Sequence, residues 1–150
     1  MSHAGLPEWL RAQLDADEQI AREATPGPWQ NAPTARHHAT ASGRSEEAVF
    51  ASPPDAGATI VAATGEAAER RHLVDAEHIV RHDPSRVLRE IDAKRQLLEL
   101  HHSIELPTEA LDACAECEVT GAYPEYPCRT LRLLALPYAD RPGYREEWRP

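Results

Sequence analysis

Three cysteines in the last third of the chain constrain this sequence more than any other feature. Cys114 and Cys117 form a C-x2-C pair, Cys128 follows them, and the pair His101 and His102 precedes them. Three thiolates and one imidazole are a common ligand set of a closed tetrahedral Zn²⁺ site. The sequence therefore predicts a metal-binding loop over residues 101–128, with zinc held by His101, Cys114, Cys117 and Cys128.

The spacing leaves the fourth ligand open. His101 falls at the end of a predicted helix, before the first cysteine, and is the favoured candidate. Its competitors are His102, Glu116 and Glu118. Four protein ligands leave no position for a substrate, so the predicted role of the zinc is structural. The alternative interpretation makes Cys114 and Cys117 surface thiols or a redox pair, and Cys128 a small buried residue.

Composition limits the classes of protein to which the chain can belong. Its 150 residues, 41% of them hydrophobic, suit one domain over residues 1–150. The 25 acidic residues outnumber the 16 basic ones, and the net charge of -9 argues against nucleic acid as a partner. No apolar stretch approaches the roughly 20 residues that span a bilayer, and no signal-peptide pattern opens the chain. We therefore expect a cytoplasmic protein, in which cysteines stay reduced and available to a metal.

Apolar periodicity predicts an α+β fold with a small helical body of three to four helices, a short antiparallel sheet and a zinc-stapled C-terminal region. The helices are expected over residues 7–24, 66–82, 84–102 and 130–138, with Asp83 as N-cap and Pro84 at the first position of the third. The strands are expected over 48–51 and 59–62, joined by 29–32 as a third. Residues 34–45 contain little to bury and are predicted to be a mobile loop. The tail over 144–150 is expected to be extended, with Tyr144 and Trp148 able to pack back onto the body.

A second group of metal-ligating side chains comprises His72, His78 and His82. His78 and His82 are four residues apart and share one face of a predicted helix, a spacing compatible with metal binding or acid–base chemistry. The glutamate of an H-E-x-x-H motif is absent, so nothing identifies a zinc protease. We expect these histidines to be exposed or at the edge of the core.

Several motifs resemble an uncharacterised protein family. They are ATPGPW at residues 24–29, HIVRHDPSRVL at 78–88, AKR at 93–95, and a closing segment over 128–150 that contains LALPYAD and PGYREEWRP. The family is a domain of unknown function found in Streptomyces, in related actinobacteria and in their phages. The resemblance spans nearly the whole chain, departs in the middle region around 36–45, and implies a cytoplasmic protein often encoded near mobile elements. It also implies a histidine before C-x2-C and a later cysteine, here His101, Cys114, Cys117 and Cys128, but no activity.

Two functions of different classes follow from these observations. The first is a non-enzymatic interaction or regulatory accessory module, with a protein partner or a second copy of the chain. Its net charge would suit a basic partner. Candidate interface anchors, which could equally belong to the core, are Trp9, Trp29, Tyr123, Tyr126, Tyr144 and Trp148. The second is a metal-dependent enzyme using His72, His78 and His82, or a thiol redox protein using Cys114 and Cys117.

Overall fold

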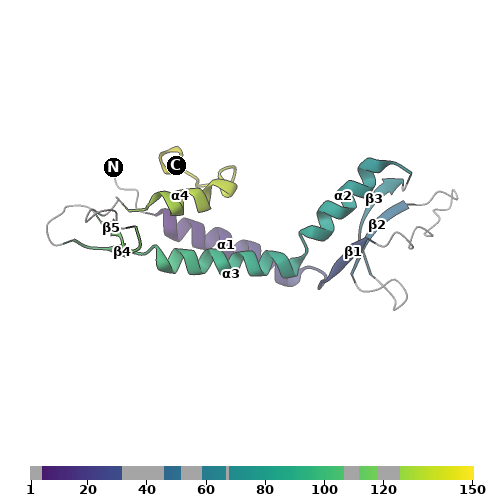
Figure 1. Cartoon of the computed structure of the whole chain (residues 1–150), viewed down its shortest axis with the longest axis horizontal. Coiled ribbons are helices and arrows are strands. Elements are labelled where there is room, and N and C mark those ends of the chain that lie inside the picture. The colour runs from purple at the N-terminus through teal and green to yellow at the C-terminus, as the bar shows by residue number, and fades with distance from the viewer. Residues whose placement is uncertain (1–4, 32–45, 52–58, 67, 107–111, 118–125) are drawn as a thin grey trace. The chain divides into compact units, whose positions relative to one another are not determined.

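The fold combines four α-helices with two antiparallel sheets in the part of the chain that the computed structural model describes (Figure 1). The described residues are 5–31, 46–51, 59–66, 68–106, 112–117 and 126–150. The helices are α1 (Leu6–Glu23), α2 (Arg70–Arg81), α3 (Pro84–Leu100) and α4 (Arg129–Ala135). The strands are β1 (Trp29–Asn31), β2 (Glu46–Ala51), β3 (Thr59–Glu66), β4 (Ser103–Ile104) and β5 (Ala113–Cys114). The predicted α+β class is confirmed.

Contacts divide the chain into two compact units. The first comprises Met1–Asp17 and Glu90–Pro150, and the second comprises Glu18–Arg89. The single domain expected over residues 1–150 stays a prediction, and the loop expected at 34–45 lies outside the described residues. None of the described helices is both long and apolar enough to cross a bilayer.

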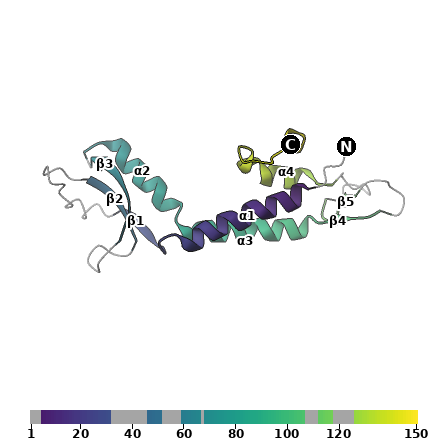
Figure 2. The ribbon, with the colours of Figure 1, turned by 180° about the vertical axis from the view of Figure 1, so that it is seen from behind.

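The second unit contains a three-stranded antiparallel sheet in the order β1-β2-β3, against which α2 packs (Figures 1 and 2). The sequence Ala-Val-Phe-Ala in β2 carries no charge, as suits a central strand buried on both faces. Its Val49 and Phe50 are at most 2% exposed, and Phe50 lies opposite Ile60 of β3. The three predicted strands are confirmed, although β2 begins earlier and β3 ends later than expected.

The second helix starts later than predicted, because residues expected in its first turn belong to a strand. β3 runs to Glu66, and α2 begins only at Arg70. Gly65 has a φ of +125°, a conformation that favours glycine and turns the chain back toward the helix. The Thr64 hydroxyl donates to the carbonyl of His72 at 2.8 Å, and His72 Nδ1 lies 3.0 Å from the carbonyl of Glu66. These contacts between strand and helix override the local helical preference.

Gly65→Ala should therefore lower the free energy of unfolding by at least about 2 kcal/mol, through backbone strain and a steric clash. A Cβ at this position would lie 2.6 Å from the His72 ring, which its hydrogen-bonding contact with Glu66 holds in place. Gly5→Ala is the matched control, because Gly5 also has a positive φ (+105°) but no atom within 4 Å of the added methyl. We expect the control to lose only about 1 kcal/mol in urea denaturation. Equal losses for the two variants would contradict the clash.

The third helix begins as the sequence predicts. The backbone N–H of Arg86 donates to Asp83 Oδ1 at 2.8 Å, which is an N-cap hydrogen bond, and Pro84 occupies the first helical position. The helix ends at Leu100, earlier than expected, because the chain then enters β4. Ile91 and Leu98 of α3 are buried.

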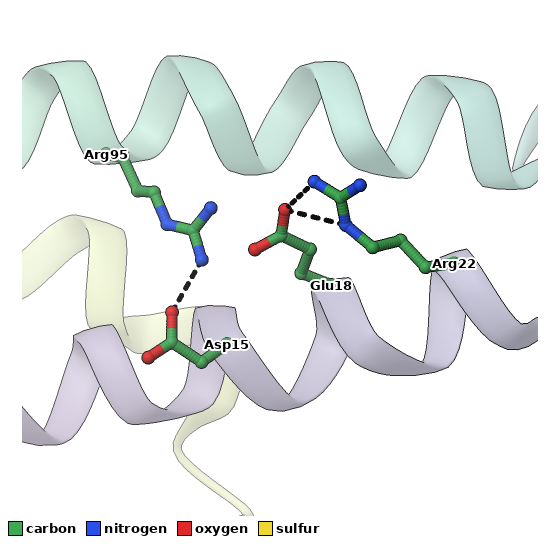
Figure 3. A network of polar contacts seen from close by, with 4 residues as sticks. All are labelled: Asp15, Glu18, Arg22 and Arg95. Carbon is green, nitrogen blue, oxygen red and sulfur yellow. Dashed lines mark hydrogen bonds and ion pairs between the residues drawn. The ribbon is translucent and has the colours of Figure 1, made fainter.

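The first unit packs the beginning of α1 beside the end of α3 (Figures 1 and 2). Its buried side chains include Leu6, Leu10, Leu14, Ile91, Leu98, Ala113, Cys114, Pro127, Cys128, Leu131, Ala135, Tyr138 and Trp148. Arg95 of α3 contacts Asp15 of α1 at 2.5 Å, and Figure 3 shows this pair together with the Glu18–Arg22 pair within α1. Asp15 is 68% exposed, so its ion pair contributes only about 0–1 kcal/mol and the apolar contacts dominate.

The last helix is shorter than predicted, and a 3-10 turn follows it. After Ala135 the chain continues as a 3-10 turn over Leu136–Tyr138, because Pro137 has no N–H for the helical ladder. The tail is not fully extended, since a second 3-10 turn forms at Glu146–Trp148.

The tail packs back onto α1 through three aromatic rings. Trp9, Tyr144 and Trp148 have ring centroids 5.4–5.8 Å apart, and Trp9 Nε1 donates to the carbonyl of Pro142 at 3.1 Å. Trp148 is 2% exposed and belongs to the core rather than to a free surface. Of the other candidate anchors, Trp29 donates to the carbonyl of Thr25, Tyr126 is half-buried, and Tyr123 lies outside the described residues.

Candidate metal centre

A short antiparallel pairing brings the C-x2-C segment back to the end of α3. β4 and β5 pair with Ser103 opposite Cys114 and Ile104 opposite Ala113. The backbone N–H of Ala115 also donates to the carbonyl of His102 at 3.0 Å. Because β4 starts two residues after His101, this register places the first cysteine beside that histidine.

Cys128 reaches the same place by a second return of the chain. The backbone N–H of Tyr126 donates to the carbonyl of Asp112 at 3.0 Å, which joins the segment before Cys128 to the segment before β5. Cys128 is then the N-cap residue of α4, and its carbonyl accepts from the N–H of Arg132 at 3.2 Å. The thiol is therefore held where a helix begins.

Four ligand atoms converge at this point. His101, Cys114, Cys117 and Cys128 each offer one atom, and all four atoms lie within 4.8 Å of one another. The Nδ1 atom of His101 lies 3.4 Å from Sγ of Cys114, 3.4 Å from Sγ of Cys117 and 3.6 Å from Sγ of Cys128. A tetrahedral zinc with the usual bond lengths would separate a sulfur and a nitrogen ligand by about 3.6 Å. The arrangement is consistent with a metal site of this type.

The four residues differ in how far they are exposed to solvent. Cys114 and Cys128 are 0% and 2% exposed, whereas Cys117 and His101 are half-buried. The backbone N–H of Glu116 donates a hydrogen bond to the Cys114 thiol, as in the turn of a C-x2-C knuckle. The cluster therefore has a buried side toward the core and a partly exposed side at Cys117 and His101.

The structure discriminates among the candidates for the fourth ligand. His102 is exposed, and its Nδ1 atom lies 3.0 Å from the carbonyl of Glu99 rather than beside the sulfurs. Glu116 is exposed and does not belong to the cluster, while Glu118 lies outside the described residues. His101 is thus the residue that the fold brings to the three cysteines.

Burial raises the pKa of two of the thiols. The pKa of Cys114 is raised chiefly by desolvation, and the pKa of Cys117 is raised to about 12 by desolvation and by the neighbouring thiols. Both thiols are consequently protonated near neutral pH when no metal is bound. A metal has to displace these protons in order to bind.

Metal affinity should therefore fall steeply as the pH is lowered. We expect the apparent Kd for Zn²⁺ to rise by more than about tenfold per pH unit below neutrality, because more than one thiol proton competes with the ion. Competition with a chromophoric chelator across that range measures it, and a pH-independent Kd would contradict it. The metal-free fold has the opposite dependence: the raised pKa of Cys117 contributes stability below its ordinary value of 9.0, which is lost as the pH rises toward about 12.

The other group of histidines does not assemble in the same way. His72 Nδ1 lies beside the carbonyl of Glu66, whereas the rings of His78 and His82 contact each other. Among the described residues, the cluster of three or more metal-ligating side chains is the one formed by His101 and the cysteines. The three-histidine site considered from the sequence is therefore not formed.

The strands that assemble the centre are the part that sequence reasoning missed. β4 and β5 have two residues each, too few for alternation or propensity to reveal them. The only available signal was the cysteine spacing itself, which requires the chain to return to the end of α3.

Comparison with known proteins supplies a family but no role. A family model described as a family of unknown function (DUF6221) matches residues 3–150. No curated protein and no solved structure matches the chain.

Proposed function

The chain belongs to the DUF6221 family, for which no function is known, and we propose its function from the metal centre. We propose that it is a small, non-enzymatic zinc-binding protein that presents a surface to a protein partner. The observation that carries the proposal is the convergence of His101 Nδ1 and three cysteine sulfurs within 4.8 Å of one another. Three sulfurs and one imidazole are soft ligands that favour Zn²⁺ over Mg²⁺ or Ca²⁺.

A structural role follows from the ligand count. Four protein ligands fill a tetrahedral ion and leave no position for a substrate or an activated water. The ion would join the end of α3, the C-x2-C turn and the start of α4. Zinc binding would then be coupled to folding of this region.

The raised thiol pKa values argue against a redox role for Cys114 and Cys117. A reactive cysteine needs a lowered pKa, so that the thiolate is populated near neutral pH. Here burial shifts the pKa of both thiols upward. Metal ligation is the chemistry that such protonated, clustered thiols support better.

We assign the partner surface to the exposed side of α4 and the turn that follows it. Leu133 and Leu136 are 49% and 38% exposed and lie one helical turn apart. The helix carries Arg129 and Arg132 and no acidic residue. Local charge therefore fits an acidic, amphipathic segment, in contrast to the basic partner that the net charge of -9 suggests.

Metal analysis of purified protein tests the zinc proposal. We expect about one zinc per chain after dialysis, lost on substitution of His101 or of any one cysteine and kept in Glu116→Ser. Protein that carries iron or copper in place of zinc, or no metal, would overturn it.

A partner test uses the paired substitution Leu133→Ser with Leu136→Ser. Leu100→Ser is the matched control, because Leu100 is an equally exposed leucine (53%) in the same unit. Sedimentation of the purified protein reports whether a second copy is the partner, and affinity capture reports whether a different protein is. Binding that survives the paired substitution would contradict the assigned surface.

A cytoplasmic location and occurrence in actinobacteria and their phages remain part of the proposal, supported by the sequence motifs.

A further inference from the structure

His78 and His82 form a pair of imidazoles at the exposed end of α2. Their ring centroids are 4.3 Å apart with planes inclined at 41°, and both side chains are exposed. A divalent ion bound at about 2 Å to one nitrogen of each ring would separate the centroids by about 5 Å. The centroids of the two rings are thus close to the separation that joint coordination requires.

The tautomer of His82 is set by the backbone. Its Nδ1 atom lies 2.7 Å from the carbonyl oxygen of His78, which accepts a hydrogen bond and cannot donate one. Nδ1 must therefore carry the proton, and Nε2 keeps the lone pair that a metal needs. A carbonyl that holds the second ring nitrogen is the usual way in which proteins orient a ligating histidine.

The charges around the histidine pair are also compatible with a bound cation. The pair lies at the C-terminal end of α2, where the helix dipole favours positive charge. The carbonyls of His78, Ile79 and Arg81 already accept hydrogen bonds there, from the His82 ring, the His82 N–H and the Arg86 guanidinium. Two cations lie in this region: Arg81 is paired with the carboxylate of Glu77, and the Arg86 guanidinium donates to the carbonyl of Arg81. His78 lines a shallow hollow together with Val74, Glu77 and Arg81, which leaves space beside the His78 ring, whereas His82 does not line this hollow.

We propose that His78 and His82 form a second metal site, distinct from the cysteine cluster, which takes an exchangeable divalent transition-metal ion such as Ni²⁺, Cu²⁺ or Zn²⁺. No third protein ligand joins the pair among the residues that the structure describes. Water would fill the remaining positions, so the site would be open, of imidazole character and weaker than the cysteine centre.

Ni²⁺ binding to zinc-loaded protein tests the proposal. Equilibrium dialysis followed by elemental analysis gives the bound Ni²⁺ and, at the same time, the retained zinc. His78→Ala and His82→Ala should each bind about one Ni²⁺ per chain fewer than the parent, or bind it at least about tenfold more weakly, while the zinc content stays unchanged. The retained zinc shows that the variants are folded at the other centre.

His102→Ala is the matched control. Its ring is exposed and its Nδ1 atom also lies beside a backbone carbonyl, that of Glu99, but no histidine lies one helical turn away. We expect this variant to bind as much Ni²⁺ as the parent. Unchanged Ni²⁺ binding by both His78→Ala and His82→Ala, or an equal loss in the control, would overturn the site.

Discussion

Cys117→Ser is expected to lower the melting temperature of the zinc-loaded protein by about 10 °C or more. With the structural zinc proposed above, one thiolate fewer would remove an ion whose binding is coupled to folding. A loss of roughly 4 kcal/mol at about 2–4 °C per kcal/mol gives a shift of this size. Cys117 is half-buried, so serine costs little in packing and the effect is attributable to the metal. Thermal unfolding with and without a chelator measures it.

The neighbouring residue provides the control for this experiment. Glu116→Ser changes an exposed side chain in the same turn but keeps the backbone N–H that donates to Cys114. We expect it to melt like the parent. A chelator should lower the parent to the melting temperature of Cys117→Ser and leave that variant unchanged. If the parent melts at one temperature with and without the chelator, the metal does not stabilise the fold.

Trp148→Ala should lower the free energy of unfolding by about 3–5 kcal/mol, because it removes the largest buried side chain of the first unit and leaves a cavity. Trp148 is 2% exposed and its ring contacts Trp9 and Tyr144, with the Arg145 guanidinium 5.3 Å from its centroid. The C-terminal segment would lose one of its ring contacts with Trp9 of α1, while the Trp9–Tyr144 contact and the hydrogen bond from Trp9 to Pro142 would remain. Urea denaturation gives the difference, and a loss below about 1 kcal/mol would show that the tail is not part of the core.

Two conservative variants separate ring packing from hydrogen bonding at this cluster. Trp148 Nε1 and the Tyr144 hydroxyl are buried and have no hydrogen-bond partner among the residues that the structure describes. Tyr144→Phe should therefore change the free energy of unfolding by no more than about 0.5 kcal/mol, and Trp148→Phe should lose far less than Trp148→Ala. A large loss in Tyr144→Phe would mean that the hydroxyl is satisfied by a group such as a bound water.

Local patterns predicted most of the secondary structure. Apolar periodicity over residues 7–24 located α1, and Asp83 before Pro84 located the start of α3, because helical hydrogen bonds and caps join residues only three or four positions apart. The errors fall where distant residues intervene. β3 continues to Glu66 because this residue pairs with Glu46 of β2, far back in the chain, and no local pattern reveals that pairing.

The ligand types and spacing were readable from the sequence, because thiolates and imidazoles have metal-binding chemistry wherever they occur. Which of these side chains lie together in the fold could not be predicted from the sequence. His101, rather than His102, joins the cysteines because the β4–β5 register returns Cys114 to the end of α3, and a pairing of two residues per strand leaves no pattern in the sequence. The same limit applies to His72, whose ring contacts the end of β3 instead of joining His78 and His82.

Residue types and interactions between near neighbours in the sequence thus account for the helices, the central strand and the four candidate ligands. Packing between segments far apart in the sequence decided which histidine lies against the sulfurs, how the C-terminal aromatics enter the core, and where the strands end. The physical reason is the range of the interactions: caps and helical hydrogen bonds connect near neighbours, whereas a metal site, a strand pair or a ring cluster forms only when the chain closes a long loop.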